Sequence, residues 1–354
     1  GTSTSWTDAS GWSPSGVPGS TNDVLIPFSA SNQPVISAGA QADCRNLYNE
    51  GTITINSDGN LSGSLIIKGK AYGGGNVKFY RQMRSQASYG DYHYFSSPVV
   101  ETISDFTTAN SSKLSQIWEW QEPNAVPWQM VTSGSFVAGK GYNLAQQSGS
   151  DGMFLFTGSL VNASVPVVAT APYATPYATP YRTPWGGGAC NLLGNPYTSA
   201  LDAAAFISAN STSFDENYLA LYIYDGVNNQ YQYAASSAPV WPFTGSFGSV
   251  VQAGQGFFVL AKQNNVTFTF NPSMQVHGTS VPLKSAQKEE AWTGLQLKIR
   301  QGDQEHTTAV IYSEKMTAGL DPGYDIGLYS AGKEVEIYTA LVKDNGVNFT
   351  QQAL

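Results

Sequence analysis

Short stretches in which apolar and polar residues alternate run along the first 85 residues. Gly, Asn, Asp and Ser separate these stretches. Three pairs of apolar residues follow one another at intervals of 12 positions: Ile53 and Ile55, Leu65 and Ile67, Val77 and Phe79. Alternation with a period of two, broken by turn residues, indicates successive β-strands. Residues 1–85 are therefore predicted to form a strand-stacked domain, either a short β-helix or an up-and-down meander.

The chain from residue 86 to 285 contains an internal repeat. Four segments of its first part recur in the same order in its second part: 96–98 with 194–196, 117–120 with 221–224, 138–145 with 253–260, and 154–156 with 267–270. The repeat predicts two β modules of similar fold, at 86–168 and 189–285. One helix is expected over 199–210, with Ser199 as its N-cap.

A segment rich in proline and aromatic residues, 169–188, lies between the two copies. Proline recurs there every four residues and is each time followed by an aromatic residue: Tyr173, Tyr177, Tyr181 and Trp185. Because proline fixes φ and disfavours helix in the residue before it, the segment is predicted to be extended. It is either a stiff spacer or an aromatic strip that docks on a neighbouring module or chain.

Residues 286–354 begin another β domain. Leu295, Leu297 and Ile299 alternate with polar residues, and further strands are predicted at 309–312 and 335–338. About four strands make only a partial β-sandwich with open edges and a thin core. Either more sequence follows in the full protein, or another chain completes this sheet. The predicted fold class is all-β and multi-domain.

The composition fits this fold and excludes some classes of binding partner. Charged residues make up 12% of the chain, against roughly 25% in ordinary domains, which argues against long amphipathic helices. The net charge of −8 disfavours nucleic acid and anionic membrane surfaces as partners. No apolar run reaches the roughly 20 residues needed for membrane insertion. The two cysteines, Cys44 and Cys190, either form a disulfide or remain as two buried free thiols.

Several segments resemble those of a known class of exported proteins. They are the tryptophan-containing opening with Val17–Pro18, the related stretches 192–197 and 254–259, and the segment 319–325. Together they resemble modular type IX secretion substrates, which are secreted or cell-surface repeat proteins of Bacteroidetes-type bacteria. The resemblance implies an extracellular or outer-surface location. It also implies that 319–325 opens a sandwich, after which that family has further strands and a sorting signal.

No pattern in the sequence indicates an enzyme. His93, His277 and His306 belong to no metal-binding helix motif. Residues 134–141 approach a phosphate-binding loop, but Gly141 stands where Ser or Thr would hold magnesium. Asp321 and Asp325, separated by turn residues, are weak candidates for binding calcium and better candidates for capping a turn through backbone amides. No cofactor is otherwise expected.

Aromatic residues at alternate positions are the candidate ligand-binding residues. Side chains at i and i+2 on a strand share a face. The candidates are Trp118, Trp120 and Trp128 in the first copy, and Tyr222, Tyr224, Tyr231 and Tyr233 in the second. These faces either fill the core of each module or form an exposed platform for stacking on sugar rings.

The sequence therefore favours a secreted, cell-surface adhesive or structural protein. Open sheet edges at the C-terminal end suggest self-assembly into a filament or layer, with other copies of the chain as partners. The alternative is a carbohydrate-binding accessory module of a secreted polysaccharide-degrading system, with surface glycans or proteins as partners.

Overall fold

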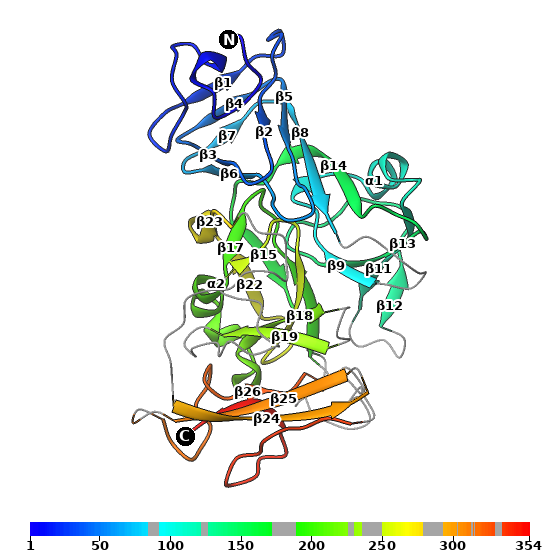
Figure 1. Cartoon of the computed structure of the whole chain (residues 1–354), viewed down its shortest axis with the longest axis vertical. Coiled ribbons are helices and arrows are strands. Elements are labelled where there is room, and N and C mark those ends of the chain that lie inside the picture. The colour runs from blue at the N-terminus through cyan, green and yellow to red at the C-terminus, as the bar shows by residue number, and fades with distance from the viewer. Residues whose placement is uncertain are drawn as a thin grey trace.

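Strands dominate the computed structural model of the chain, and its helices are few and short (Figure 1). The structure describes residues 1–83, 92–121, 127–171, 189–225, 230–235, 250–278, 293–302, 304–312, 314, 316–329 and 335–354. Within these residues no helix is long and apolar enough to cross a membrane. The all-β, multi-domain fold class predicted from the sequence is confirmed.

The N-terminal strands form a short parallel β-helix rather than a meander. They are β1 (Val24–Ile26), β2 (Val35–Ile36), β3 (Gln41–Cys44), β4 (Leu47–Asn49), β5 (Thr52–Ile55), β6 (Ser64–Ile67), β7 (Ala71–Tyr72) and β8 (Asn76–Gln82), preceded by the 3-10 turn η1 (Ala9–Gly11). Parallel pairing joins β1-β4-β7, β2-β5-β8 and β3-β6. Ile53 lies opposite Val77, whereas Leu65 lies opposite Ala42 on another side of the coil. The 12-residue spacing in the sequence is therefore half a coil.

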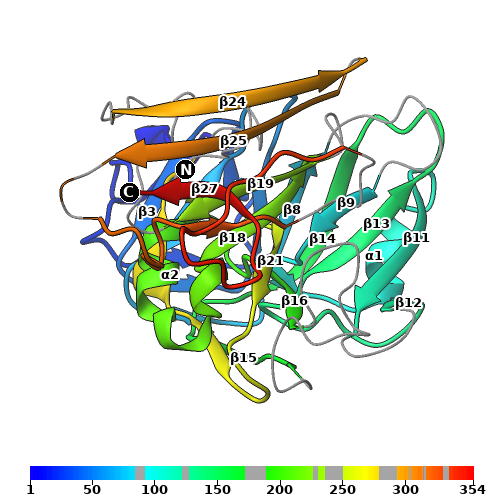
Figure 2. The same cartoon turned by 90° about the horizontal axis from the view of Figure 1, so that it is seen from below.

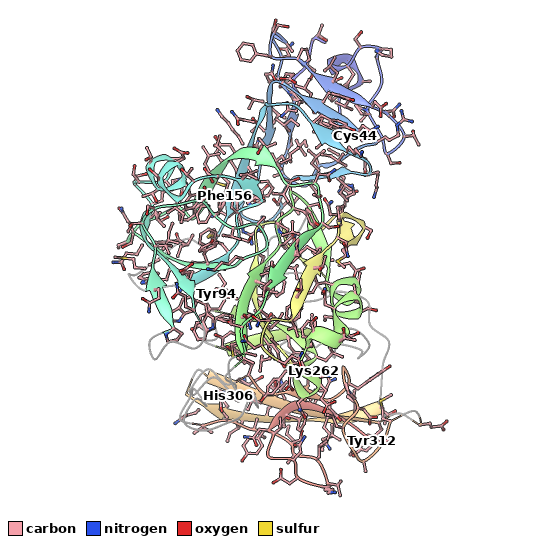
Figure 3. The ribbon with its side chains drawn as sticks, turned by 180° about the vertical axis from the view of Figure 1, so that it is seen from behind. Cys44, Tyr94, Phe156, Lys262, His306 and Tyr312 are labelled. Atoms are coloured by element: carbon pink, nitrogen blue, oxygen red, sulfur yellow. The ribbon has the colours of Figure 1, made fainter. Side chains whose placement is uncertain are left out.

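Both cysteines are buried free thiols. Cys44 points into the β-helix, where Figure 3 labels it, and Cys190 is the first residue of a strand of the second module, Cys190–Gly194. The disulfide alternative was wrong, and the prediction of two free thiols is confirmed. Burial raises the pKa of the Cys44 thiol to about 12, so the protonated thiol packs as a small apolar group.

The two repeats fold alike. The first contains β9 (Tyr92–Phe95), β10 (Val99–Val100), α1 (Ile103–Ala109), β11 (Leu114–Trp120), β12 (Trp128–Met130), β13 (Tyr142–Gln146) and β14 (Met153–Leu160). The second contains β15 (Val165–Val168), β16 (Cys190–Gly194), β17 (Ala200–Asp202), α2 (Ala203–Ala209), η2 (Ser211–Ser213), η3 (Glu216–Tyr218), β18 (Ala220–Asp225), β19 (Gln230–Ala235), β20 (Val250–Val251), β21 (Gly256–Leu260), β22 (Thr267–Phe270), η4 (Pro272–Met274) and β23 (Gln275–Val276). Their four-stranded sheets have matching orders, β12-β11-β13-β9 and β19-β18-β21-β16.

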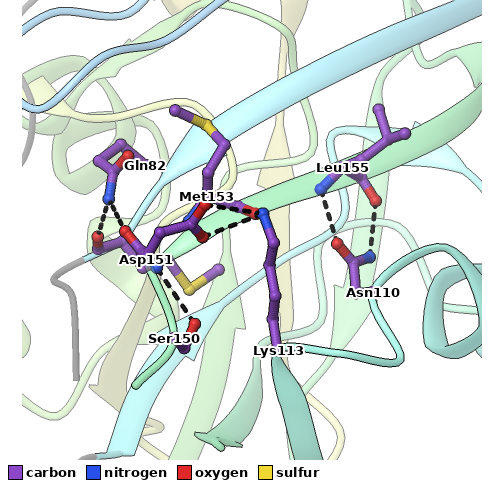
Figure 4. Close-up of polar contacts among 9 residues, drawn as sticks. Gln82, Asn110, Lys113, Ser150, Asp151, Met153 and Leu155 are labelled. Atoms are coloured by element: carbon purple, nitrogen blue, oxygen red, sulfur yellow. Dashed lines mark hydrogen bonds and ion pairs between the residues drawn. The ribbon is translucent and has the colours of Figure 1, made fainter. Parts of the chain in front are cut away.

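The same asparagine clamp closes the helix in both copies. The Asn110 side chain caps α1 and exchanges two hydrogen bonds with the backbone of Leu155, at 2.8 and 2.9 Å (Figure 4). Asn210 caps α2 and exchanges two with the backbone of Thr269, at 3.1 and 2.7 Å. The helices are thereby fixed to the equivalent strands β14 and β22, and each places a buried phenylalanine, Phe106 or Phe206, against the core.

The helix predicted over 199–210 is shorter than expected. It begins at Ala203, and Asp202 is its N-cap, with a carboxylate oxygen accepting from the Ala205 amide. Residues 200–202 are instead strand β17, because this stretch pairs with β20 and β23. The Ser199 hydroxyl, proposed as the cap, donates to the Gln275 side chain. The equivalent helix α1, capped by Thr102, was not predicted.

The β-helix and the first module share one core. Strand β14 pairs antiparallel with β8, so the sheet that begins in the β-helix continues into the module. Buried side chains from Trp6 to Phe156 form a single apolar cluster. One apolar core therefore includes residues from before and after the domain boundary predicted at residue 85.

The two modules contact each other reciprocally. The amide of Ser96 donates to the carbonyl of Gly254 at 2.9 Å, and the amide of Gly194 donates to that of Gly139 at 3.0 Å. Ser96 corresponds to Gly194 in the repeat, and Gly139 corresponds to Gly254. Each module thus offers the same strand to the same turn of the other, which is the pattern that a two-fold axis produces between identical subunits.

The C-terminal residues form one described sheet that packs on the second module. Its strands are β24 (Thr293–Gln301), β25 (Gln304–Tyr312), β26 (Ile326–Gly327) and β27 (Phe349–Ala353), in the order β24-β25-β27-β26. The strand predicted at 335–338 is wrong, because these residues do not pair with any strand of the described sheet. The next residue, Thr339, forms a single β-bridge with Phe349. Figure 1 shows the sheet at the end of the molecule opposite the β-helix.

Candidate functional site

The predicted tyrosines of the second module lie on the sheet face that the C-terminal sheet covers. Tyr222 lies opposite Tyr233 across strands β18 and β19, and Tyr224 lies opposite Tyr231. The intervening Ile223 points the other way, into the core of its own module. The sequence rule that placed these tyrosines on one shared face was therefore correct.

Hydrogen bonds tie these tyrosines to the C-terminal sheet. The Tyr222 hydroxyl donates to the carbonyl of Gly327 at 3.0 Å, and the Tyr233 hydroxyl donates to Gln351 Oε1 at 3.0 Å. Burial raises the pKa of Tyr222 well above its usual range, so the phenol stays neutral and keeps its donor. The two residues join one part of the chain to another.

The tryptophans of the first module meet the same interface. The Trp120 indole donates to the carbonyl of Cys190 at 2.9 Å, and its ring lies edge-on to Trp128 with centroids 5.0 Å apart. Trp118, two residues away on the same face, is partly buried opposite Asn143. The pair Trp120–Trp128 corresponds in the repeat to Tyr224–Tyr231, whose centroids are 5.4 Å apart.

Tyr94 joins the two equivalent aromatic pairs, and the sequence reasoning missed it. Its ring stacks with Trp128 at 5.7 Å and lies 5.8 Å from Tyr224, and its hydroxyl bonds that of Tyr231 at 3.0 Å (Figure 3). Tyr329 of the C-terminal part lies edge-on to Tyr231 at 4.4 Å. The candidate aromatic residues are thus brought together, but mainly as a junction between modules, which favours the core interpretation over the exposed platform.

The remaining predicted site residues fall into two groups. Tyr173, Tyr177, Tyr181 and Trp185 lie outside the described residues, and their role stays a prediction. Asp321 and Asp325 lie in one turn. Asp321 Oδ2 accepts from the Thr317 amide at 2.7 Å, and Asp325 accepts from the amides of Asp321 and Ala353, both at 2.7 Å.

These bonds make the two carboxylates turn caps. Burial raises the pKa of Asp325 to about 6 in spite of its two amide donors. Across the described parts of the chain, no three His, Cys, Asp or Glu side chains gather as metal ligands. Calcium binding at Asp321 and Asp325 has no support beyond the residue types.

The outer strand of the C-terminal sheet is the strongest candidate for a functional surface. Strand β24 stands at the edge of the sheet, with β25 as its neighbour in the described order (Figure 2). Its apolar residues Leu295, Leu297 and Ile299 are 52%, 43% and 38% exposed. They alternate with polar residues, so all three point to one face. An edge strand of nine residues with an apolar face is a template for pairing with another strand.

The charges of β24 are engaged within its own hairpin. Lys298 and Arg300 each contact a carboxylate oxygen of Glu305 at 2.8 Å. Hydrogen bonds from Lys298 and then Arg300 lower the pKa of Glu305 to about 2. Charged side chains on an edge strand normally deter pairing. Here the positive charges are balanced by the neighbouring strand, so this deterrent is weak.

The chain matches the family described as a domain of unknown function (DUF8693) over residues 49–347. It belongs to this family. No curated protein and no solved structure matched the chain. The DUF8693 match begins in the second coil of the β-helix and runs through both modules into the C-terminal sheet, so the aromatic junction and strand β24 both lie inside it.

A further polar cluster in this DUF8693 protein was also missed by the sequence reasoning. His277 Nδ1 lies 2.9 Å from the hydroxyl of Ser64, and His277 Nε2 lies 2.9 Å from a carboxylate oxygen of Asp43. These are the residue types of a hydrolase triad, but Ser64 is only 1% exposed and its amide already donates to Ala40. The cluster therefore fastens the second module to neighbouring strands β3 and β6 of the β-helix.

Proposed function

We propose that this chain is an extracellular adhesive or structural protein of the bacterial cell surface that associates with a second copy through strand β24. The observation that carries the proposal is the exposed apolar edge of that strand. Low charge, modular β architecture and the resemblance to type IX secretion substrates support the location outside the cell.

The other end of the C-terminal sheet favours β24-to-β24 pairing. The opposite outer strand, β26, is only two residues long, and Gly327 within it lies against Tyr218 of the second module. A head-to-tail contact between β24 and β26 would therefore have little backbone to pair. Antiparallel pairing of two β24 strands satisfies the free backbone edge of both copies, sets Leu295, Leu297 and Ile299 of the two copies side by side on one face, and closes a two-fold dimer.

A filament or layer requires a second contact. A two-fold contact uses the same surface on both partners and ends there. Growth beyond a dimer thus needs another surface of the molecule, and the proline-aromatic segment around Tyr173 and Trp185 is the predicted candidate for it.

Substitution at the middle of β24 tests the proposal. Leu297→Lys adds a charge to the exposed face and should convert a two-chain species into a single chain in sedimentation velocity and light scattering. Val342→Lys is the matched control, because Val342 is 81% exposed elsewhere in the C-terminal part. This control should leave the dimer intact.

Hydrogen exchange gives a second readout. The amides of β24 should exchange more slowly in the wild type than in Leu297→Lys, because strand pairing protects the outer edge. A wild-type protein that sediments as a single chain at every loading, with rapidly exchanging β24 amides, contradicts the assembly proposal.

A further inference from the structure

A ladder of three exposed side chains runs along one outer face of the β-helix. Leu25, Tyr48 and Tyr72 occupy equivalent positions on β1, β4 and β7 and lie opposite one another in the parallel register. They are 65%, 47% and 43% exposed. We call these residues the tyrosine strip. The sequence signal for it is the 24-residue separation of Tyr48 and Tyr72, which is twice the 12-residue interval of the strands.

The two tyrosine rings of the strip stack on each other and are both partly exposed. The rings of Tyr48 and Tyr72 stack with centroids 4.7 Å apart and planes at 20°. Among the described strands, β7 is the last of this sheet. The chain continues there as Gly73, Gly74 and Gly75, and a Cβ added at Gly74 would meet nothing within 4 Å. The chain directly after Tyr72 therefore carries no side chains.

A positive charge lies beside this terminal ring. Lys70 is two residues before Tyr72, and Lys68 is close along the chain; both are exposed. Among the described residues neither forms an ion pair, whereas the nearby Arg45 is paired with Asp23. Lys70 directly precedes strand β7, and its carbonyl accepts from the Leu47 amide, so it continues the pairing of β7 with β4. Side chains at i and i+2 of such an extended segment share a side and lie about 7 Å apart. The Lys70 ammonium is thus placed to meet an acidic group on a molecule that covers Tyr72.

We propose that the tyrosine strip binds an acidic polysaccharide of the uronic-acid type. The apolar C–H face of a pyranose ring stacks on the exposed part of Tyr72, and the carboxylate of the same or the next sugar pairs with Lys70. The chemistry fits the Tyr72 end of the strip, where Lys68 and Lys70 are exposed, and not the Tyr48 end, where Glu50 is exposed. Nucleic acid would need a broader basic patch than these lysines provide.

This inference is independent of assembly through β24. The tyrosine strip lies on the β-helix, at the opposite end of the long axis from β24 (Figure 1). It also places carbohydrate binding on residues other than the tryptophans and tyrosines of the two modules. The Leu297→Lys variant should therefore bind polysaccharide as the wild type does, whichever mass it has in solution.

Titration of the full chain with sodium polygalacturonate and with neutral dextran tests the proposal. Calorimetry or affinity electrophoresis should show binding to polygalacturonate that weakens as salt is added, and no binding to dextran. Tyr72→Ala should weaken binding about tenfold, and Lys70→Gln should weaken it and flatten the salt dependence. Tyr72→Trp should retain binding because it keeps a flat aromatic ring.

Matched controls use an exposed tyrosine and an exposed lysine far from the strip. Tyr338→Ala and Lys343→Gln lie in the C-terminal part and should leave binding unchanged. Circular dichroism and thermal unfolding establish that Tyr72→Ala is folded. Equal binding to dextran, binding that survives Tyr72→Ala, or no binding to polygalacturonate by the wild type would each overturn the proposal.

Discussion

At the scale of single residues, the buried carboxyl of Glu101 is the most consequential titratable group. Its Oε1 accepts from the Thr157 amide at 3.0 Å, while Oε2 has no hydrogen-bond partner among the described residues. Burial raises its pKa from 4.5 to about 8, and the nearby Asp105 adds to this, although the Thr157 bond acts the other way. The proton on Glu101 therefore stays bound in the folded state over a range where the unfolded chain has lost it.

The consequence is a stability that falls as pH rises. Below about pH 4.5 the carboxyl is protonated in both states, and stability with respect to this group is greatest. Between about 4.5 and 8 the folded state holds an extra proton, so the free energy of unfolding falls by up to about 1.4 kcal/mol for each pH unit. Glu101→Gln should remove this dependence and be the more stable protein near pH 8.

Urea unfolding at several pH values measures this difference. Glu305→Gln is a useful contrast, because its carboxyl has a lowered pKa and is exposed to solvent. Glu305→Gln should change the pH dependence of the free energy of unfolding only in the acid range. Parallel profiles for the wild type and Glu101→Gln between pH 5 and about pH 8 would show that Glu101 does not titrate as described.

At the scale of elements, the sequence predicted where strands lie better than it predicted which strands pair with each other. Alternation located strands such as β5, β6 and β24, because inward and outward positions follow directly from the pleat. It could not decide between a β-helix and a meander, since the direction of pairing depends on chain far from the strand. The helix start at Ala203 was misplaced for the same reason: residues 200–202 pair with strands that come later in the sequence.

Substitution of the two clamp asparagines tests whether they stabilise both copies of the repeat in the same way. Asn210→Ala removes the side-chain bonds to Phe206 and Thr269 and leaves buried backbone groups unpaired. It should lower the free energy of unfolding by about 1–3 kcal/mol, and Asn110→Ala should have a similar effect.

Asn348→Ala is the matched control, because Asn348 is exposed. It should stay within about 0.5 kcal/mol of the wild type in the same denaturant titration. A loss for Asn210→Ala no larger than for the control would mean that the clamp contributes little to stability.

At the scale of the whole molecule, parts distant in sequence decide what each surface can do. The aromatic residues of the modules were correctly placed on shared faces, yet the sheet that covers Tyr222 and Tyr233 begins some 60 residues later in the chain. A stacked pair of exposed aromatic residues lies on the β-helix instead, where equivalent positions on successive coils bring Tyr48 and Tyr72 together. The local alternation of residues shows which side chains share a face of a strand, but it does not show which other part of the chain covers that face.

The reciprocal contact between modules can be tested at its turn. Gly254 has a positive φ of 66°, and a Cβ there would lie 3.1 Å from the Ser96 carbonyl oxygen in the other module. Gly149 has a φ of 79° with nothing within 4 Å of its Cβ position. Both alanine variants lose about 1 kcal/mol to backbone strain.

Gly254→Ala should lose more than Gly149→Ala, because it also disturbs the contact with the other module. Thermal unfolding of the two variants side by side measures the difference. Equal midpoints would indicate that the contact tolerates a methyl group at this turn.

The reciprocal contact also bears on how the two copies can diverge. In a dimer of identical subunits every substitution appears twice, so both outer faces must change together. Here the two copies belong to one chain and can vary separately. The second copy lines its outer face with tyrosines beneath the C-terminal sheet, and the first carries tryptophans at the equivalent positions. The two copies thus share the same contact with each other, while their outer faces carry different aromatic residues.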